Sequence, residues 1–451
     1  MTSAAERLAA NMNFGVLARA TELKQRILFV LGALIVYRIG TYIPLPGVDP
    51  VVLDQIFKQN AGGILGVFNM FSGGALGRMT IFALAVMPYI SASIIMQLMG
   101  VAVPQLAQLK KEGEAGRRKI NQYTRYGTVL LAMVQGYGIA VGLEGMEGPN
   151  GGSAVMDPGW FFRFSTVITL TGGTMFLMWL GEQITARGIG QGISLIIFAG
   201  IVAELPGAVA GTLELGQKNV IPTGTMLLIL AIALGLVALI VYVERAQRRV
   251  LIQYPKRQVG NKLYKGENTH LPLKLNTAGV IPPIFASSIL LFPLTIAGFN
   301  SGDGPEWLRI VSAYLGHGQP LYIALYVAII VFFCFFYTAV VFNAEETADN
   351  LKKNGGFIAG IRPGKHTAEY LDYVLTRLTA VGAVYLALVC TAPEILIAKY
   401  SVPFYLGGTS LLIVVNVIMD FVGQVQSHLF AHQYEGLIKK AKLKGTGRRR
   451  S

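Results

Sequence analysis

Few residues of this sequence stand in a pattern that could support catalysis or metal binding. No HExxH, GxSxG or CxxC motif occurs, and the segment from Gly360 to Lys365 is one residue short of a phosphate-binding GxxxxGK[ST] loop. His428 and His432 are spaced to share one helix face, but no third ligand is matched to them. The two cysteines, Cys334 and Cys390, lie in apolar runs and provide no disulfide framework. We therefore expect no enzyme, no catalytic residue, no metal site and no cofactor.

The composition is that of a membrane protein. The chain has 451 residues, of which 53% are hydrophobic and only 14% are charged, and its mean hydropathy is +0.53. A soluble domain carries about 25% charged residues, so these values exclude intrinsic disorder, a disulfide scaffold and an ordinary soluble enzyme. We expect a polytopic membrane protein, because a span uses only about 20 apolar residues.

Ten apolar runs predict ten transmembrane helices. They lie at residues 27–43, 79–101, 124–143, 161–180, 189–205, 223–243, 276–298, 321–342, 374–396 and 404–425. Because the number of spans is even, both ends of the chain should lie on the same side of the membrane.

The basic residues indicate which side that is. The net charge is +14, and most of the 38 Lys and Arg residues fall in alternate loops and the two tails, at 1–26, 102–126, 181–188, 244–275, 343–377 and 426–451. The intervening loops hold few, and residues 144–160 hold none. Since cytoplasmic loops are enriched in Lys and Arg, we predict that both termini are cytoplasmic. Such basic loops also favour an anionic partner, such as RNA or an acidic protein surface.

Charge is scarce inside the predicted spans, where Arg38 and Asp420 are the main exceptions. An intramembrane charge is a candidate functional group. Both residues lie near span ends, however, where snorkelling or a structural ion pair explains them. An ion-coupled transporter would bury carboxylates at the midplane, and this sequence does not.

A Gly-rich apolar segment at residues 61–77 is too short to cross a bilayer. Irregular backbone survives at membrane depth only inside protein or beside a water-filled cavity, so we predict that this segment dips into a cavity. A surface-bound interfacial helix is the alternative.

Ten spans divide into two halves of five. Because each half has an odd number of spans, the second half enters the membrane from the opposite side and is inverted relative to the first. Residues 88–94, PYISASI, resemble residues 283–289, PIFASSI, in the seventh span. Inverted repeats place the working site near the midplane, where the repeats meet. From these residues alone, a channel and a small-solute transporter remain equally open.

Two long basic loops carry turn signals that topology alone does not require. In the first, 244–275, strand-forming residues at 250–254 and the turn dipeptide Gly260-Asn261 predict a hairpin. In the second, 343–373, Arg362 lies in a Gly- and Pro-rich loop. It can offer its guanidinium to a carboxylate or phosphate of a partner there.

Several long motifs resemble the SecY family, whose bacterial members are the channel subunits of the Sec protein translocase. The resemblance covers about residues 14–447. Its motifs are NMFSGGAL, MPYISASII, KKEGEAGRRKINQYTRYGT, GTMFLMWLGEQIT, RGIGQGIS, THLPLKLN, GVIPPIFASSILLFP, ETADNLKKNGGFIAGIRPG and VPFYLGGTSLLIVV.

The resemblance implies an all-α fold of ten transmembrane helices in two inverted halves, 27–205 and 206–425, between tails 1–26 and 426–451. It implies a re-entrant plug half-helix at about 62–76, with Gly62, Gly63, Ile64, Leu65, Gly66, Val67, Phe68, Asn69, Met70, Phe71 and Ser72 as its plug residues. The family's pore ring falls on Val86, Ile90, Ile193, Ile197, Ile284 and Ile413. Its lateral gate, between spans 2–3 and 7–8, is expected to use Ser91, Ser93, Gln97, Gln135, Asn276, Ser287 and Ser288.

The resemblance also implies function and partners. A motor or the ribosome would contact Lys256, Arg257, Lys262, Arg362 and Lys365. The expected function is a protein-conducting channel in the bacterial plasma membrane. It would pass unfolded secretory proteins and release transmembrane helices into lipid. The expected partners are the SecE and SecG subunits, the SecA ATPase, the ribosome, signal sequences and unfolded substrates, membrane lipid, SecDF and YidC.

Overall fold

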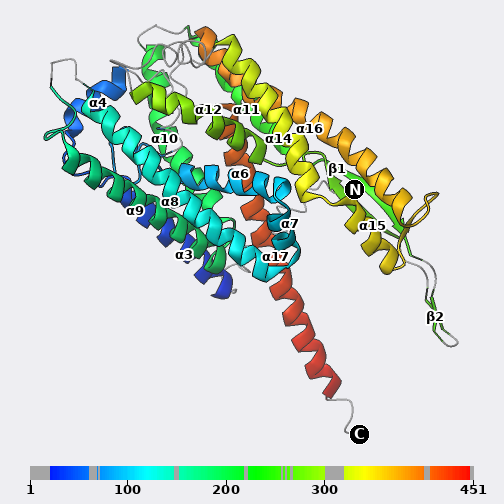
Figure 1. Ribbon diagram of the computed structural model, residues 1–451. Helices are drawn as coiled ribbons and strands as arrows, with labels where there is room; N and C mark the ends of the chain where they lie inside the picture. Colours follow the sequence, from blue (N-terminus) through cyan, green and yellow to red (C-terminus); the bar gives the residue numbers. More distant parts are fainter. Residues whose placement is uncertain are drawn as a thin grey trace.

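The computed structural model describes residues 21–59, 69, 72–146, 152–217, 222–254, 257–259, 262–264, 268–299, 319–400 and 407–446. Long helices form one elongated bundle, and a small sheet and the end of α17 project beyond it (Figure 1). Seven described helices are long and apolar enough to cross a membrane, or eight if the bent pair α6–α7 counts as one span. With α3 and the shorter apolar helix Ile281–Leu290 of α12, a helix occupies each of the ten predicted spans.

The structure describes seven helices in the first half of the chain. They are α3 (Thr21–Gly40), α4 (Pro50–Gln59), α6 (Met87–Ala102), α7 (Pro104–Lys111), α8 (Glu114–Glu144), α9 (Trp160–Arg187) and α10 (Gly192–Gln217).

In the second half, the described residues form six helices and five strands. The helices are α11 (Thr223–Arg245), α12 (Ile281–Phe299), α14 (Pro320–Val341), α15 (Ala344–Lys353), α16 (Lys365–Tyr400) and α17 (Gly408–Thr446). The strands are β1 (Gln247–Gln253), β2 (Arg257–Val259), β3 (Lys262–Tyr264), β4 (Asn268–Lys274) and β5 (Phe357–Ile358).

The order of packing repeats between the halves. In the first half α6 packs on α8, α8 on α9 and α9 on α10; in the second, α12 packs on α14, α14 on α16 and α16 on α17. Each half contributes five spans, so the second is inverted relative to the first. The largest buried cluster joins both halves, because α6, α8, α9 and α10 share it with side chains of α12, α14 and α17.

The second span differs from its prediction. Its helix begins at Met87, whereas residues 72–86 form a chain of turns. Met79 and Ala85 have positive φ angles, which interrupt a helix. Leu45 N donates to the Met79 carbonyl oxygen and Ile81 N donates to the Ile43 carbonyl oxygen, so these backbone groups of the segment have hydrogen-bond partners. The apolar run at 79–86 therefore reports burial inside protein rather than helical structure.

One other predicted boundary also differs, whereas α6 ends at Ala102, next to the predicted end of the second span at residue 101. The predicted end of the first half, after residue 205, falls inside α10, which continues through Pro206 to Gln217. After α6 the chain bends by 103° into α7. Pro104 opens α7, in the first turn of a helix where proline is tolerated.

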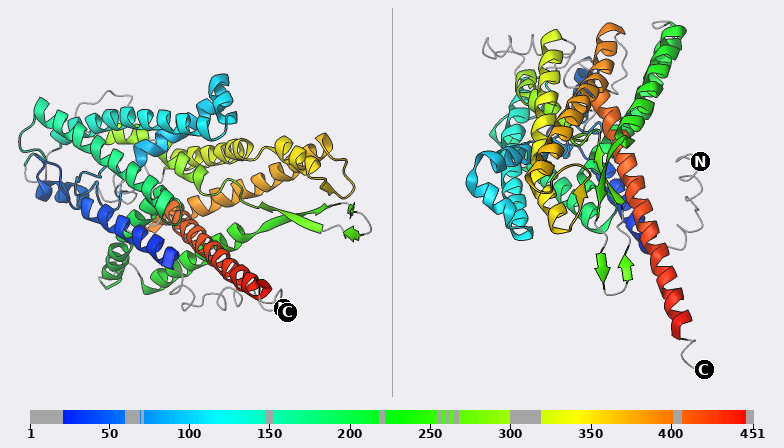
Figure 2. Two further views of the ribbon diagram at one scale, coloured as in Figure 1. Left: turned by 90° about the horizontal axis from the view of Figure 1, so that it is seen from below. Right: turned by 90° about the vertical axis from the view of Figure 1, so that its right-hand side faces the viewer.

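The two long basic loops meet in one small sheet. The predicted hairpin is present, because β1 pairs antiparallel with β4 over seven residues, and β2 pairs with β3 at its tip. Strand β5 from the other loop pairs with β1 through Ile252 and Ile358, so the sheet order is β4-β1-β5. Figure 2 shows the hairpin extending away from the helices at the same end of the molecule as the tail of α17.

Candidate functional site

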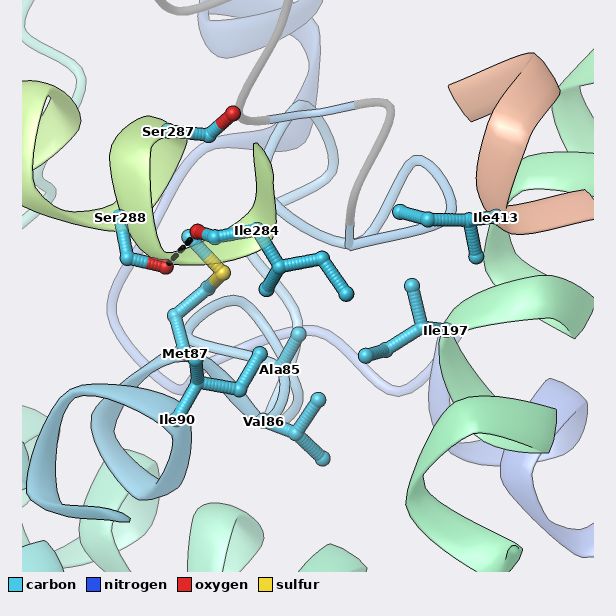
Figure 3. Close-up of a pocket in the computed structure, with 9 residues that line it drawn as sticks. All are labelled: Ala85, Val86, Met87, Ile90, Ile197, Ile284, Ser287, Ser288 and Ile413. Carbon is cyan, nitrogen blue, oxygen red and sulfur yellow. Dashed lines mark hydrogen bonds between the residues drawn. The ribbon is translucent and has the colours of Figure 1, made fainter. Parts of the chain in front are cut away.

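A small apolar cavity lies where four helices of both halves meet. It is lined by Ala85, Val86, Met87, Ile90, Ile197, Ile284, Ser287, Ser288 and Ile413. Its water-accessible volume of about 10 Å³ is room for one water molecule. Figure 3 shows Ile90, Ile197, Ile284 and Ile413 turned toward this space from separate elements.

The aliphatic side chains of the cavity come from four helices and from the turn that precedes α6. Val86 precedes the first turn of α6, which Pro88 helps to start, and Ile90 lies one turn later on that helix. Ile197, Ile284 and Ile413 come from α10, α12 and α17. Ile90, Ile197 and Ile413 are buried, at 7%, 6% and 1% exposure. Five of the six predicted ring residues are thus brought together.

Ile193, the sixth predicted ring residue, does not line the cavity. Its side chain instead packs against the backbone of Gly181 on α9, where an added Cβ would lie 2.9 Å from Ile193 Cγ1. Ile193 points this way because α9 and α10 approach each other closely at their connection. Ile193 and Ile197 are one helical turn apart, so their spacing alone suggested that both side chains face the same space.

The cavity suits the exclusion of water and ions. Water is stable in a buried site only where it finds two to four polar partners, and here the lining is mainly aliphatic. Ser288 already donates its hydroxyl to the Ile284 carbonyl oxygen at 2.8 Å. Among the described residues no group of His, Cys, Asp or Glu is arranged to hold a metal ion.

The predicted lateral-gate residues on α6, α8 and α12 lie on helices that touch across the two halves. Within α6, the Ser93 hydroxyl accepts a hydrogen bond from Gln97 Nε2 at 3.5 Å. Ser91 on the same helix is half-buried. Gln135 Oε1 on α8 is buried with no hydrogen-bond partner in the described chain. Ser287 bonds to the Pro283 carbonyl oxygen at 2.9 Å and contacts the Tyr326 hydroxyl within the second half.

No hydrogen bond or ion pair between described residues joins α6 or α8 to α12. By contrast, two ion pairs tie α8 to α9: Arg125 to Glu182 at 2.7 Å and Arg163 to Glu144 at 2.6 Å. We call the contact of α6 and α8 with α12 the seam. Among its described side chains the contact is apolar packing, whereas polar contacts reinforce the halves on either side.

Asn276 lies away from the other predicted gate residues. It precedes α12, is 4% exposed, and donates Nδ2 to Glu244 Oε1 of α11 at 2.6 Å. The same amide pairs with both backbone groups of Gly279. Its polar contacts therefore stay within the second half and do not reach α6 or α8.

Of the predicted plug residues, only Asn69 and Ser72 belong to the described chain; Gly62–Phe68, Met70 and Phe71 lie outside it. The residues that follow are held firmly. Tyr37 donates its hydroxyl to the Ser72 carbonyl oxygen at 3.3 Å, and Arg38 Nη1 donates to the Gly73 carbonyl oxygen at 2.8 Å. We call Ser72, Gly73 and Gly74 the plug root.

A charged cluster surrounds the plug root. Arg38 and Arg78 both lie over the Tyr42 ring, 5.0 and 4.3 Å from its centroid. Arg78 approaches Glu204 of α10 at 3.8 Å. Arg38 thus makes structural hydrogen bonds, to the Gly73 carbonyl oxygen and to the Tyr42 hydroxyl. Sequence reasoning missed Glu204, whose only signal was a carboxylate at the end of an apolar run.

The predicted partner contacts gather at the projecting sheet. Arg362 and Lys365 are exposed, and Arg362 offers its backbone carbonyl to Thr367 at 2.9 Å. Arg257 and Lys262 lie on β2 and β3 at the hairpin tip, whereas Lys256 lies outside the described residues.

A ten-helix membrane protein with a water-sized aliphatic constriction between two inverted halves has the architecture of a channel. The SecY family model matches residues 80–422, and the chain belongs to the SecY family. This confirms the resemblance seen in the sequence and the expected all-α fold.

The relatives are similar over nearly their whole length. The chain is 59% identical over 428 residues to the protein translocase subunit SecY of Escherichia coli (strain K12), covering 95% of this chain and 96% of that protein. It is 58% identical over 426 residues to the protein translocase subunit SecY of Rickettsia conorii (strain ATCC VR-613 / Malish 7), covering 94% and 97%.

Two solved structures share the fold. A structure of a protein conducting channel superposes with a TM-score of 0.63 at 17% identity, covering 89% of this chain and 92% of that chain. Sec61 in the canine ribosome–channel complex from the endoplasmic reticulum superposes with a TM-score of 0.60 at 16% identity, with the same coverage. Membership of this family makes the chain a multi-pass membrane subunit of a translocase, and a pore rather than an enzyme.

Proposed function

We propose that the chain forms a protein-conducting channel that passes unfolded secretory proteins and releases transmembrane helices sideways into lipid. The observation that carries the proposal is the aliphatic cavity shared by α6, α10, α12 and α17. An unfolded chain cannot cross lipid unaided, because each unpaired backbone group costs several kcal/mol in hydrocarbon. An aliphatic constriction excludes ions by dewetting at rest and deforms around a passing chain.

The resting seal has two parts in this function. Val86, Ile90, Ile197, Ile284 and Ile413 form the constriction, and segment 62–76 acts as a plug. The hydrogen bonds from Tyr37 and Arg38 to the plug root support this arrangement. An anchored root keeps a displaced plug attached to the first half, so it can return after each passage.

The seam is the lateral exit. Opening it breaks no hydrogen bond or ion pair between described residues, whereas parting α8 from α9 would break two ion pairs. A segment of apolar residues that enters the seam gains free energy by reaching lipid, about 0.3–0.6 kcal/mol for each Leu, Ile, Phe or Val. The signal sequence is then the ligand that favours the open seam.

The projecting sheet is the docking surface for partners that drive transport. We place it on the cytoplasmic side with both termini, in the plasma membrane of a bacterium, because the basic loops gather there. We propose that SecA and the ribosome drive transport and that SecE and SecG accompany the chain as subunits. SecA and the ribosome would contact Lys256, Arg257, Lys262, Arg362 and Lys365. SecDF and YidC are further proposed partners.

Reconstitution tests the function directly. The chain with SecE and SecG in lipid vesicles should protect a secretory precursor from external protease when SecA and ATP are supplied. Arg362→Glu should reduce this protection about 10- to 150-fold, since a lost charge-assisted contact is worth about 1.5–3 kcal/mol.

Lys353→Glu is the matched control, because this exposed residue lies in the same loop on α15 and is expected to leave transport unchanged. Absence of ATP-dependent protection with the unmodified chain would contradict the channel function. Normal protection with Arg362→Glu would contradict only the proposed motor contact.

A further inference from the structure

A six-residue elbow, residues 275–280, connects strand β4 of the projecting sheet to α12 at the seam. Leu275 N donates to the Ala246 carbonyl oxygen at 3.0 Å, so the pairing of β1 with β4 continues to the end of α11. Gly279 has a φ of +64°, a conformation that glycine adopts without strain. The elbow is therefore a defined turn with its own hydrogen bonds.

The centre of the elbow is the buried pair of Glu244 and Asn276. The two side chains are 8% and 4% exposed, and Asn276 Nδ2 reaches Glu244 Oε1 at 2.6 Å. Asn276 Oδ1 accepts from Gly279 N, and Nδ2 also donates to the Gly279 carbonyl oxygen, both at 3.1 Å. One amide thus connects the last turn of α11 to the turn that starts α12.

The elbow also lies directly on α16. A Cβ added to Gly382 would come 3.1 Å from the Leu275 carbonyl oxygen and 3.6 Å from Asn276 Cα. Lys274, Tyr385 of α16, and Asn416 and Asp420 of α17 are further polar groups that face Glu244. Helices α11, α16 and α17 therefore all lie next to the Glu244–Asn276 pair.

We propose that the Glu244–Asn276 pair transmits the docking of a partner on the projecting sheet to α12, and thereby to the seam. This inference rests on the proposed function. A movement of β1 and β4 reaches α12 because the elbow is hydrogen-bonded at both ends. At the seam itself, α12 meets α6 and α8 through apolar packing, which yields more readily than the elbow. Glu244 and Asn276 are positioning residues that contact no substrate.

The test separates docking from its consequence. Fluorophores on cysteines placed at Ile95 of α6 and Ile289 of α12, both exposed, report the separation across the seam. The native Cys334 and Cys390 are buried and remain unlabelled. SecA with ATP is added to the reconstituted complex, and SecA affinity, seam opening and thermal stability are measured in the same preparation.

Glu244→Leu and Asn276→Leu should each reduce the SecA-driven opening about tenfold, because each removes the hydrogen bond between the two side chains, while SecA affinity stays within about twofold. Glu244→Gln should restore opening, since its amide oxygen accepts the same hydrogen bond. The double variant should be no worse than either single one, because the two residues act as a unit. Thr376→Val, on an exposed face of α16, is the control and should resemble the unmodified chain.

Unchanged opening in Glu244→Leu would overturn the inference, and so would an equal loss of SecA affinity and opening. If the unmodified chain fails to transport precursor under SecA and ATP, the proposed function fails instead. If it transports normally and the variants open normally, only the transmitting role of the pair is wrong.

Discussion

Arg38 Nη1 donates a 2.8 Å hydrogen bond to the carbonyl oxygen of Gly73, 35 positions later in the sequence. This contact joins the C-terminal end of α3 to the plug root. Gly73 has a positive φ, and a Cβ there would lie 2.8 Å from Gly200 Cα of α10. The root is therefore held between α3 and α10, the first and fifth spans of one half.

Replacing Arg38 by Met should loosen the proposed seal. The variant loses a charge-assisted hydrogen bond worth about 1.5–3 kcal/mol, so the fraction of channels with a displaced plug should rise by up to about 10- to 150-fold. Conductance of the resting complex in planar bilayers measures this change. Arg26→Met on the same helix, which removes an exposed pair with Glu22, should leave conductance unchanged. Equal conductance in both variants would show that Arg38 does not hold the plug.

A polar group in the cavity should stabilise water there. Ile284→Asn offers a water molecule one or two hydrogen bonds of about 0.5–1.5 kcal/mol each, so resting ion leak should rise at least about 2- to 10-fold. Ile193→Asn is the informative comparison, because Ile193 does not line the cavity. A leak through Ile193→Asn as large as that through Ile284→Asn would place the constriction elsewhere.

The ion pairs at the two ends of the α8–α9 contact should differ in their effect on stability. Glu144 is 11% exposed, pairs with Arg163 and accepts from Gly159 N at the start of α9, so one carboxylate serves two elements. Glu182 is 37% exposed, and such pairs contribute about 0–1 kcal/mol. Glu144→Gln should lower the Tm by several degrees, and Glu182→Gln by little. Thermal unfolding of the purified complex measures both, and the reverse order would contradict the assignment.

The corner between α9 and α10 should not tolerate a side chain at Gly192. A Cβ there would overlap the carbonyl oxygen of Gly181 and lie 2.9 Å from its Cα, so Gly192→Ala should cost about 3 kcal/mol or prevent accumulation. Gly207→Ala, on the same helix with nothing within 4 Å of its Cβ, should be neutral or stabilise by about 0.5–1 kcal/mol. Measuring the level and Tm of the folded protein distinguishes the two, and a fully stable Gly192→Ala would disprove this account of the corner.

Local patterns in the sequence were enough for the class, the spans and the hairpin. Apolar runs predict where helices cross the membrane, and each of the ten predicted spans contains a helix. Alternating strand residues at 250–254 predicted the hairpin that β1 and β4 form. The motifs of the SecY family placed five aliphatic residues that the structure gathers around one cavity. The spans and the hairpin depend on residues close together in sequence, and each family motif is itself a continuous stretch, so these signals can be found without the structure.

Only the tertiary structure decided how distant segments share those elements. It turned Ile193 toward Gly181, paired Asn276 with Glu244, and joined the two basic loops through Ile252 and Ile358. It also made the apolar residues at 79–86 a buried series of turns rather than the start of a helix. Hydropathy indicates that a side chain is buried away from water. Which other side chain it then contacts depends on how separate helices pack, and the local spacing of residues does not encode that packing.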